Sequence, residues 1–134
     1  MYGALDTSTS ALVANRSWLN VISANLANKD AILNEEGEYD PYRRKFAVFQ
    51  AGDPATGSSM GVHVGAIQED DSELMPRYEP GSPYADENGY VMYPNVNPVL
   101  EQTNAMVAAR SYEANVTAAE ATKSMMNVAL QLLA

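Results

Sequence analysis

Few residues in this sequence have a type and spacing that could do chemistry. The single histidine, His63, lies in an alternating stretch with no carboxylate or serine motif attached, which favours a structural or solvent-facing role over a general base. The acidic residues around Gly37 do not fall at the alternating positions that an EF-hand loop requires before its glycine. We therefore predict no enzyme, no catalytic residue, no metal site and no cofactor.

A phosphate-binding loop is also disfavoured. Gly57, Gly61 and Gly65 recur every four residues, but they lack the strand-to-helix context and the Lys-Ser/Thr ending that cradle a phosphate. The chain has no cysteine, which excludes a disulfide framework and a thiolate metal site. Catalysis and cofactor binding therefore leave no signature in this sequence.

The charge of the chain limits the class of its partners. The formal net charge is −9, and residues 31–98 hold twelve carboxylates against four cations. Nucleic acids and anionic membrane surfaces need clustered cations, so neither is predicted as the main partner.

No stretch approaches the roughly 18 apolar residues of a membrane span. The N-terminus lacks a basic region followed by an apolar run, so it is not a general secretory signal, and these signals alone predict a cytosolic protein.

A long amphipathic helix is predicted at the N-terminus. It begins close to Gly3 or Asp6 and runs to about Asn28, roughly 38 Å at about 1.5 Å per residue. Four leucines fall seven residues apart along it, with an isoleucine between the last two: Leu5, Leu12, Leu19, Ile22 and Leu26.

A second long helix is predicted at the C-terminus. It starts just after Pro98, because proline excludes the helical conformation at Asn97, and it runs to Leu133. Lys123 alone interrupts a series of apolar residues that recur at alternating steps of four and three. The series consists of Ala105, Ala109, Tyr112, Val116, Ala119, Met126, Leu130 and Leu133.

The two helices favour an assembling protein. A sustained seven-residue spacing is typical of helices that wrap around partners. The alternative is a pair of ordinary amphipathic helices packed together in a monomer. A middle segment of only about 70 residues can hardly cover both helices, so their apolar faces must meet each other or other copies.

Strand-like patterns appear between the helices. Residues 45–50 and 61–67 alternate as two short strands, and residues 51–60 are predicted to connect them flexibly. Tyr84 and residues 90–93 flank Asn88-Gly89, which predicts a type I′ hairpin with Gly89 at positive φ. We therefore expect an α+β fold. Its long terminal helices are expected to pack as an antiparallel, coiled-coil-like pair, with a small β-rich segment between them that contains the hairpin. The chain then divides into three regions: an N-terminal helix (1–30), a β-rich middle with extended loops (31–98) and a C-terminal helix (99–134).

Specific segments resemble a known family. Residues 23–28, Ser-Ala-Asn-Leu-Ala-Asn, look like the signature shared by bacterial flagellar rod and hook proteins. Three further regions resemble the FlgC family of flagellar basal-body rod proteins, so that the likeness runs from end to end. They are YRRKFAVFQ at residues 42–50, YEPGSPYAD at 78–86 leading to GYVMYPNV at 89–96, and ARSYEANV at 109–116 followed by KSMM at 123–126. The chain departs from the family pattern in its acidic link at residues 31–40 and in stopping soon after Leu133.

The resemblance implies a structural role. Its members are non-enzymatic subunits of the proximal rod, the drive shaft that crosses the periplasm and transmits torque. They leave the cell through the flagellar type III export apparatus without a cleavable signal peptide. The implied partners are copies of the chain, the rod proteins FlgB, FlgF and FlgG, and FliE, which joins the rod to the MS ring. A helical adaptor with one partner, and a small enzyme with a site built from two chains, are the competing hypotheses.

The predicted functional residues are therefore assembly contacts. The terminal helices are expected to be largely unformed, or only loosely paired, in the isolated monomer and to become ordered on assembly. Arg43, Arg44 and Lys45 are candidate contacts between subunits, with a solvated face as the alternative. The predicted helical interface comprises Leu5, Leu12, Leu19, Ile22, Asn25, Leu26, Asn28, Ala105, Ala109, Arg110, Tyr112, Asn115, Val116, Ala119, Lys123, Met126, Leu130 and Leu133.

Overall fold

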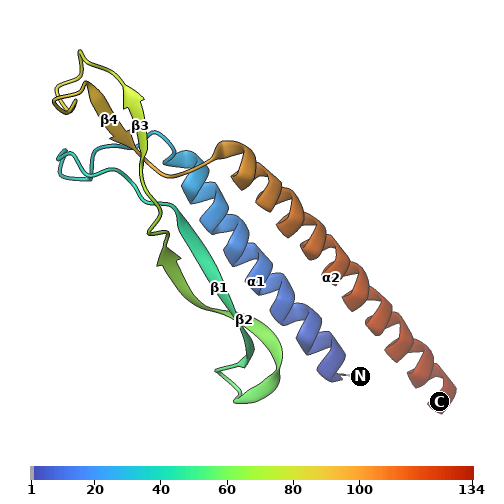
Figure 1. Ribbon diagram of the computed structural model, residues 1–134. Helices are drawn as coiled ribbons and strands as arrows, with labels where there is room; N and C mark the ends of the chain where they lie inside the picture. The colour runs from blue at the N-terminus through green and yellow to red at the C-terminus, as the bar shows by residue number, and fades with distance from the viewer. Residues whose placement is uncertain (1) are drawn as a thin grey trace.

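Two long helices and two β-hairpins make up the chain in a computed structural model that describes residues 2–134. Met1, the first residue of the predicted N-terminal region, lies outside the described residues. The elements, in order, are α1 (Tyr2–Ala27), β1 (Lys45–Asp53), β2 (Ser58–Glu69), β3 (Met75–Tyr78), β4 (Tyr90–Tyr93) and α2 (Pro98–Leu133). The helices lie side by side and antiparallel, β1 and β2 lie along α1, and both chain ends lie at the same end of the pair (Figure 1). The α+β prediction is confirmed.

The start of α2 is determined by Asn97, the residue before the helix, and by Pro98, its first residue. Asn97 caps the helix, because its side-chain oxygen accepts hydrogen bonds from the backbone N–H groups of Val99 (3.1 Å) and Leu100 (3.3 Å). Pro98 occupies the first turn, where its missing N–H removes no helical bond. The helix therefore begins at Pro98, one residue before the predicted start.

The two helices pack through one line of residues on α2. Glu101, Ala108 and Thr122 are buried there, with half-buried Asn115 between the last two, and each is seven residues from the next. From α1, the Asn15 amide donates to the Ser111 hydroxyl at 3.0 Å. The predicted apolar series of α2 lies beside this line, not at its centre, because the residues that contact α1 are small or polar and do not stand out by hydrophobicity.

The hairpin of β1 and β2 covers one side of α1. Trp18 meets Phe49 edge to face, with 5.7 Å between ring centroids, and the Ser10 hydroxyl accepts a hydrogen bond from the Val62 N–H at 3.1 Å. The predicted flexible connection over residues 51–60 is wrong in extent, because both strands continue into it and only residues 54–57 form the turn. Gly52 adopts a φ of +93°, which lets β1 pass an irregularity in register between Ala51 and Asp53.

The second hairpin differs from the predicted one. β4 pairs antiparallel with β3, whereas Tyr84 lies outside any strand, in the connection between them. Gly89 does have a positive φ of +84°, but Asn88 does not, so the type I′ turn is wrong. The reason is Asp86, whose side-chain oxygen accepts from the N–H groups of Asn88 and Tyr90, both at 2.9 Å, and so closes a different turn.

Tyr39 covers the outer edge of β4. Its hydroxyl donates to the Met92 carbonyl and accepts from the Met92 N–H, each at 3.0 Å. Its ring stacks on Tyr84 with 5.3 Å between centroids. The acidic link at residues 31–40 that carries Tyr39 is therefore an ordered loop, closed by a bridge between Leu33 and Tyr39.

Candidate assembly site

A buried asparagine joins the helices to the sheet. The Asn25 side chain is fully buried and satisfies all of its hydrogen-bonding groups. Its amide donates to the Lys45 carbonyl (2.7 Å) and to the Glu101 carboxylate (3.2 Å). Its oxygen accepts from the Lys45 N–H (2.9 Å) and the Tyr42 hydroxyl (2.9 Å). One residue of the Ser23–Asn28 signature thus holds α1, the start of β1 and α2 together.

An ion pair lies next to this asparagine. Glu101, on the first turn of α2, is completely buried, and its carboxylate pairs with the Arg44 Nε. A second Arg44 nitrogen lies 3.4 Å from the Asp70 carboxylate at the end of β2. A buried carboxylate needs such a partner, because removing an unpaired charge from water costs several kcal/mol. Arg44 therefore makes the burial of Glu101 possible.

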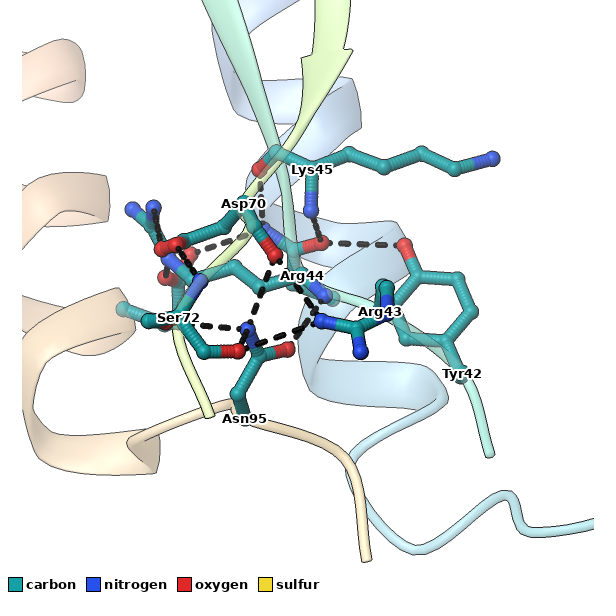
Figure 2. Close-up of polar contacts among 9 residues, drawn as sticks. Tyr42, Arg43, Arg44, Lys45, Asp70, Ser72 and Asn95 are labelled. Atoms are coloured by element: carbon teal, nitrogen blue, oxygen red, sulfur yellow. Dashed lines mark hydrogen bonds and ion pairs between the residues drawn. The ribbon is translucent and has the colours of Figure 1, made fainter. Parts of the chain in front are cut away.

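Asn95 secures the segment that follows β2. Its oxygen accepts from the Arg44 N–H at 2.8 Å, and its amide donates to the backbone carbonyls of Asp70 (3.1 Å) and Ser72 (3.2 Å). The Arg43 guanidinium also donates to these two carbonyls, at 3.4 and 3.1 Å. Figure 2 shows these side chains converging between the strands and the helices. We call this cluster the polar joint, and its residues are Asn25, Tyr42, Arg43, Arg44, Asp70, Asn95 and Glu101.

Two titrating groups of the polar joint have shifted pKa values. Hydrogen bonds from Ser72, and then the nearby Arg44, hold the pKa of Asp70 below its ordinary value of 3.8. Burial, reinforced by the negative charges of Glu101 and Glu69, raises the pKa of Tyr42 above 10.0. At neutral pH Asp70 is therefore an anion that attracts Arg44, and Tyr42 keeps the proton that it donates to Asn25.

The three predicted cationic contacts point in different directions. Arg43 and Arg44 bond within the chain, as described above. The Lys45 side chain extends away from the polar joint (Figure 2), with its nitrogen 5.7 Å from the centroid of the Tyr42 ring. Within residues 2–134 the Lys45 side-chain nitrogen forms neither a hydrogen bond nor an ion pair, whereas Arg43 donates to two backbone carbonyls and Arg44 pairs with two carboxylates.

The predicted helical interface is divided between the inside and the outside of the chain. Two of its members, Ile22 and Asn25, are buried. Members that are half-buried beside the helix pair are Leu5, Leu12, Leu19, Leu26, Asn28, Ala105, Ala109, Asn115, Val116, Ala119 and Met126. The exposed members, all on α2, are Arg110, Tyr112, Lys123, Leu130 and Leu133. The exposed group leaves apolar surface on α2 that α1 does not cover.

The sequence interpretation missed several residues of the polar joint. Glu101 and Asn95 were not singled out, because a glutamate in the first turn and an asparagine in a loop are ordinarily solvated. The spacing of Glu101, Ala108, Asn115 and Thr122 was a usable signal, since it matches the seven-residue spacing of the leucines in α1.

No catalytic arrangement emerges from the described part of the chain. His63 is half-buried, and its Nδ1 lies 2.8 Å from the Gly52 carbonyl oxygen. Residues 2–134 contain no group of three or more acidic, histidine or cysteine side chains that could hold a metal ion. In the same residues, neither α1 nor α2 is apolar over enough of its length to cross a membrane.

Comparison with known proteins identifies the family. Residues 5–30 match the family model for flagella basal body rod protein, and residues 87–132 match that for the flagellar basal body rod FlgEFG protein C-terminal region. The flagellar basal-body rod protein FlgC of Bacillus subtilis is 40% identical, over 98% of this chain and 97% of its own length. Those of Salmonella typhimurium and Escherichia coli O157:H7 are 45% and 43% identical, each over 95% of this chain and 93% of its own length. The chain therefore belongs to the FlgC family of flagellar basal-body rod proteins.

Proposed function

We propose that this chain is a non-catalytic structural subunit of the proximal rod, which assembles through its terminal helices and transmits torque along the shaft. The observation that carries the proposal is the similarity to rod proteins of the FlgC family over nearly the whole length of both chains. The geometry supports it as well, because the two terminal helices form the long axis of the molecule (Figure 1). Apolar residues along α2 are also exposed.

The polar joint supports a load-bearing role. It connects α1, β1, the end of β2 and the first turn of α2 through hydrogen bonds and two ion pairs of Arg44. Two of its residues, Asn25 and Glu101, are fully buried. Charged and fully bonded groups of this kind fix one relative orientation of the elements they join. The β1–β2 hairpin therefore turns with the helix pair as one body. Residues 1–30, 31–98 and 99–134 are proposed as the three regions of that body.

The proposed partners are other rod proteins. They are copies of this chain, FlgB, FlgF, FlgG and the adaptor FliE. These partners would meet the exposed and half-buried members of the helical interface named above, with Leu130 and Leu133 among the most exposed. We place the assembled subunit in the periplasmic part of the basal body. We also propose that the chain passes through the type III export apparatus without a cleavable signal peptide. Export requires the chain to unfold, and because the chain has no cysteine, no disulfide resists that unfolding.

The test is genetic replacement followed by isolation of the rod. A flagellated strain whose own FlgC gene is deleted is supplied with this chain carrying a small epitope tag in the turn at residues 54–57. Swimming should return, and the tag should be found in purified basal bodies. Swimming that returns while the tag is absent from basal bodies would refute the rod role. A matched strain with the untagged chain controls for an effect of the tag.

A further inference from the structure

The chain has more surface than a compact protein of its size. Its accessible area is 8965 Å², whereas a folded monomer of 14.5 kDa has about 6,900 Å² by the usual scaling with mass. The excess, about 2,000 Å² by the same scaling, is the amount that one partner of a large obligate interface buries. The surface of this chain is therefore sized for at least one extensive contact with another chain.

A groove runs along α1 on the side that α2 leaves free. It consists of three hollows between α1 and the β1–β2 hairpin, with volumes of about 420, 370 and 620 Å³. The first and second hollows share Ser10 and Asp53, and the second and third share Ser17. Asn15 points to α2, and Ser17 lies two residues further, about 200° around the helix, so the groove faces away from α2.

The lining of the groove suits a helix. Four of the residues that line it on α1 are small and seven apart, namely Gly3, Ser10, Ser17 and Ala24, and Asp6, Val13 and Asn20 are among the larger residues between them. Small side chains at this spacing let a second helix approach closely along the whole length. The rim carries three apolar side chains that water reaches, namely Val13 (63% exposed), Met60 (59%) and Ile67 (56%). A bound apolar helix would cover all three.

A matching stripe lies on α2 of the same chain. Leu100, Val107, Ala114, Ala121 and Val128 are seven residues apart, and every one of them is exposed. Met125 and Leu132 extend the same stripe and are 60% and 83% exposed. The stripe runs beside the buried line of Glu101, Ala108 and Thr122, so it continues the contact that already joins α2 to α1.

We propose that the groove of one copy receives the α2 stripe of a second copy of this chain. The proposal rests on the rod function proposed above and names the contact that builds it. Groove and stripe occupy different surfaces of the chain, so each copy can receive one neighbour and enter another. Such a head-to-tail contact does not close on itself as a two-fold dimer does, and it lets copies add in a helical series.

The proposed contact can be tested by disulfide cross-linking, because the chain has no cysteine of its own. Two variants, Ser17→Cys in the groove and Ala121→Cys in the stripe, are co-expressed in a strain that depends on this chain, and basal bodies are isolated under mild oxidation. Both changes are small and lie outside the buried residues, so folding is preserved. The matched control replaces Ala121→Cys with Lys123→Cys, because Lys123 is also exposed but lies about 200° around α2.

The expected result is a disulfide-linked pair of chains that is roughly tenfold more abundant with Ala121→Cys than with Lys123→Cys, a difference of about 1.4 kcal/mol in contact preference. Equal yields, a product in which Ala121→Cys links only to itself, or capture of Ser17→Cys by a different rod protein would each overturn the proposed contact. If the variants are present in basal bodies but do not cross-link, this inference fails and the rod function stands. If swimming cells build basal bodies without the variants, the rod function itself fails.

Discussion

Asn25 holds the backbone of Lys45 from both sides, donating to its carbonyl at 2.7 Å and accepting from its N–H at 2.9 Å. The side chain thus takes the place of a neighbouring strand at the first residue of β1. A helix and a sheet rarely share hydrogen bonds of this kind, because the backbone groups of each are normally paired within the element. Here the pairing fixes where the hairpin departs from α1.

We expect Asn25→Asp to destabilise the chain by about 2–4 kcal/mol, because it replaces both amide donors with an acceptor beside the Glu101 carboxylate. Asn28→Asp is the control from the same signature, since the Asn28 amide bonds only to the Ala24 carbonyl within α1. Urea unfolding followed by circular dichroism measures both. Equal losses of stability in the two variants would contradict the role assigned to Asn25.

The buried ion pair between Glu101 and Arg44 should contribute to the stability of the chain. Glu101→Gln keeps the shape of the side chain but removes the charge that faces Arg44, and we expect a loss of about 2 kcal/mol. Glu113→Gln, on an exposed position of α2, should change the free energy of unfolding by less than about 0.5 kcal/mol. A Glu101→Gln variant as stable as the original chain would show that the buried pair contributes nothing net.

The lowered pKa of Asp70 predicts the direction of one pH effect. A carboxylate with a depressed folded-state pKa adds stability that is fully present above its ordinary value of 3.8 and is lost as the pH falls through the folded value. Unfolding midpoints measured at falling pH should therefore drop less steeply for Asp70→Asn than for the original chain below pH 3.8. Parallel curves for the two proteins would rule out this contribution of Asp70.

Gly89 has a conformation and a setting that exclude larger residues. Its φ is +84°, and a Cβ added there would lie 3.0 Å from a ring carbon of Tyr78 and 3.2 Å from the Pro80 Cβ. Gly89→Val should cost about 1–3 kcal/mol through backbone strain and crowding. Gly81→Val, in the same connection but with open space around it and no positive φ, is the control and should be nearly neutral.

Ordering of the terminal helices on assembly stays a prediction, which amide hydrogen exchange on the dilute monomer addresses. The reason for expecting it is the exposed apolar surface, with Leu132 at 83% and Leu133 at 86% exposed. In the monomer the helix pair should be loose away from the polar joint, so residues 5–26 and 105–130 should exchange faster than β1 and β2, most of all at the ends farthest from Asn25 and Glu101, and become protected in assembled rods. Helices as protected as the strands, independently of concentration, would contradict it.

The helices were predictable from sequence because their signals are local. Pro98 and the seven-residue leucine spacing each act within one or two turns, and the structure places α1 and α2 within a residue or two of the expected bounds. The family followed from short motifs in the same way. The Ser23–Asn28 signature, however, indicated only the family. It did not indicate the contacts that Asn25 makes.

The polar joint was not predictable, because its contacts join residues far apart in the chain. Asn25 and Glu101 are separated by 76 positions, and nothing local indicates that a first-turn glutamate is buried. The prediction of the second hairpin was wrong for a related reason. Asn88-Gly89 is a strong local turn signal, but the Asp86 side chain closes a different turn. The strand that pairs with β4 is β3, which lies earlier in the chain than Tyr84. Local preference was overridden by side-chain bonding and strand pairing.

The Tyr39 hydroxyl occupies the backbone carbonyl and N–H of Met92. It therefore blocks one mode of association, the addition of a strand from another chain at this edge of β4. An open strand edge is a template on which another chain can add a strand, and the products of such addition are aggregates. At Met92 the template is already filled by a side chain, which a foreign strand would have to displace. A member of a family whose proteins build a rod is in this way kept from adding a foreign strand at this edge of β4.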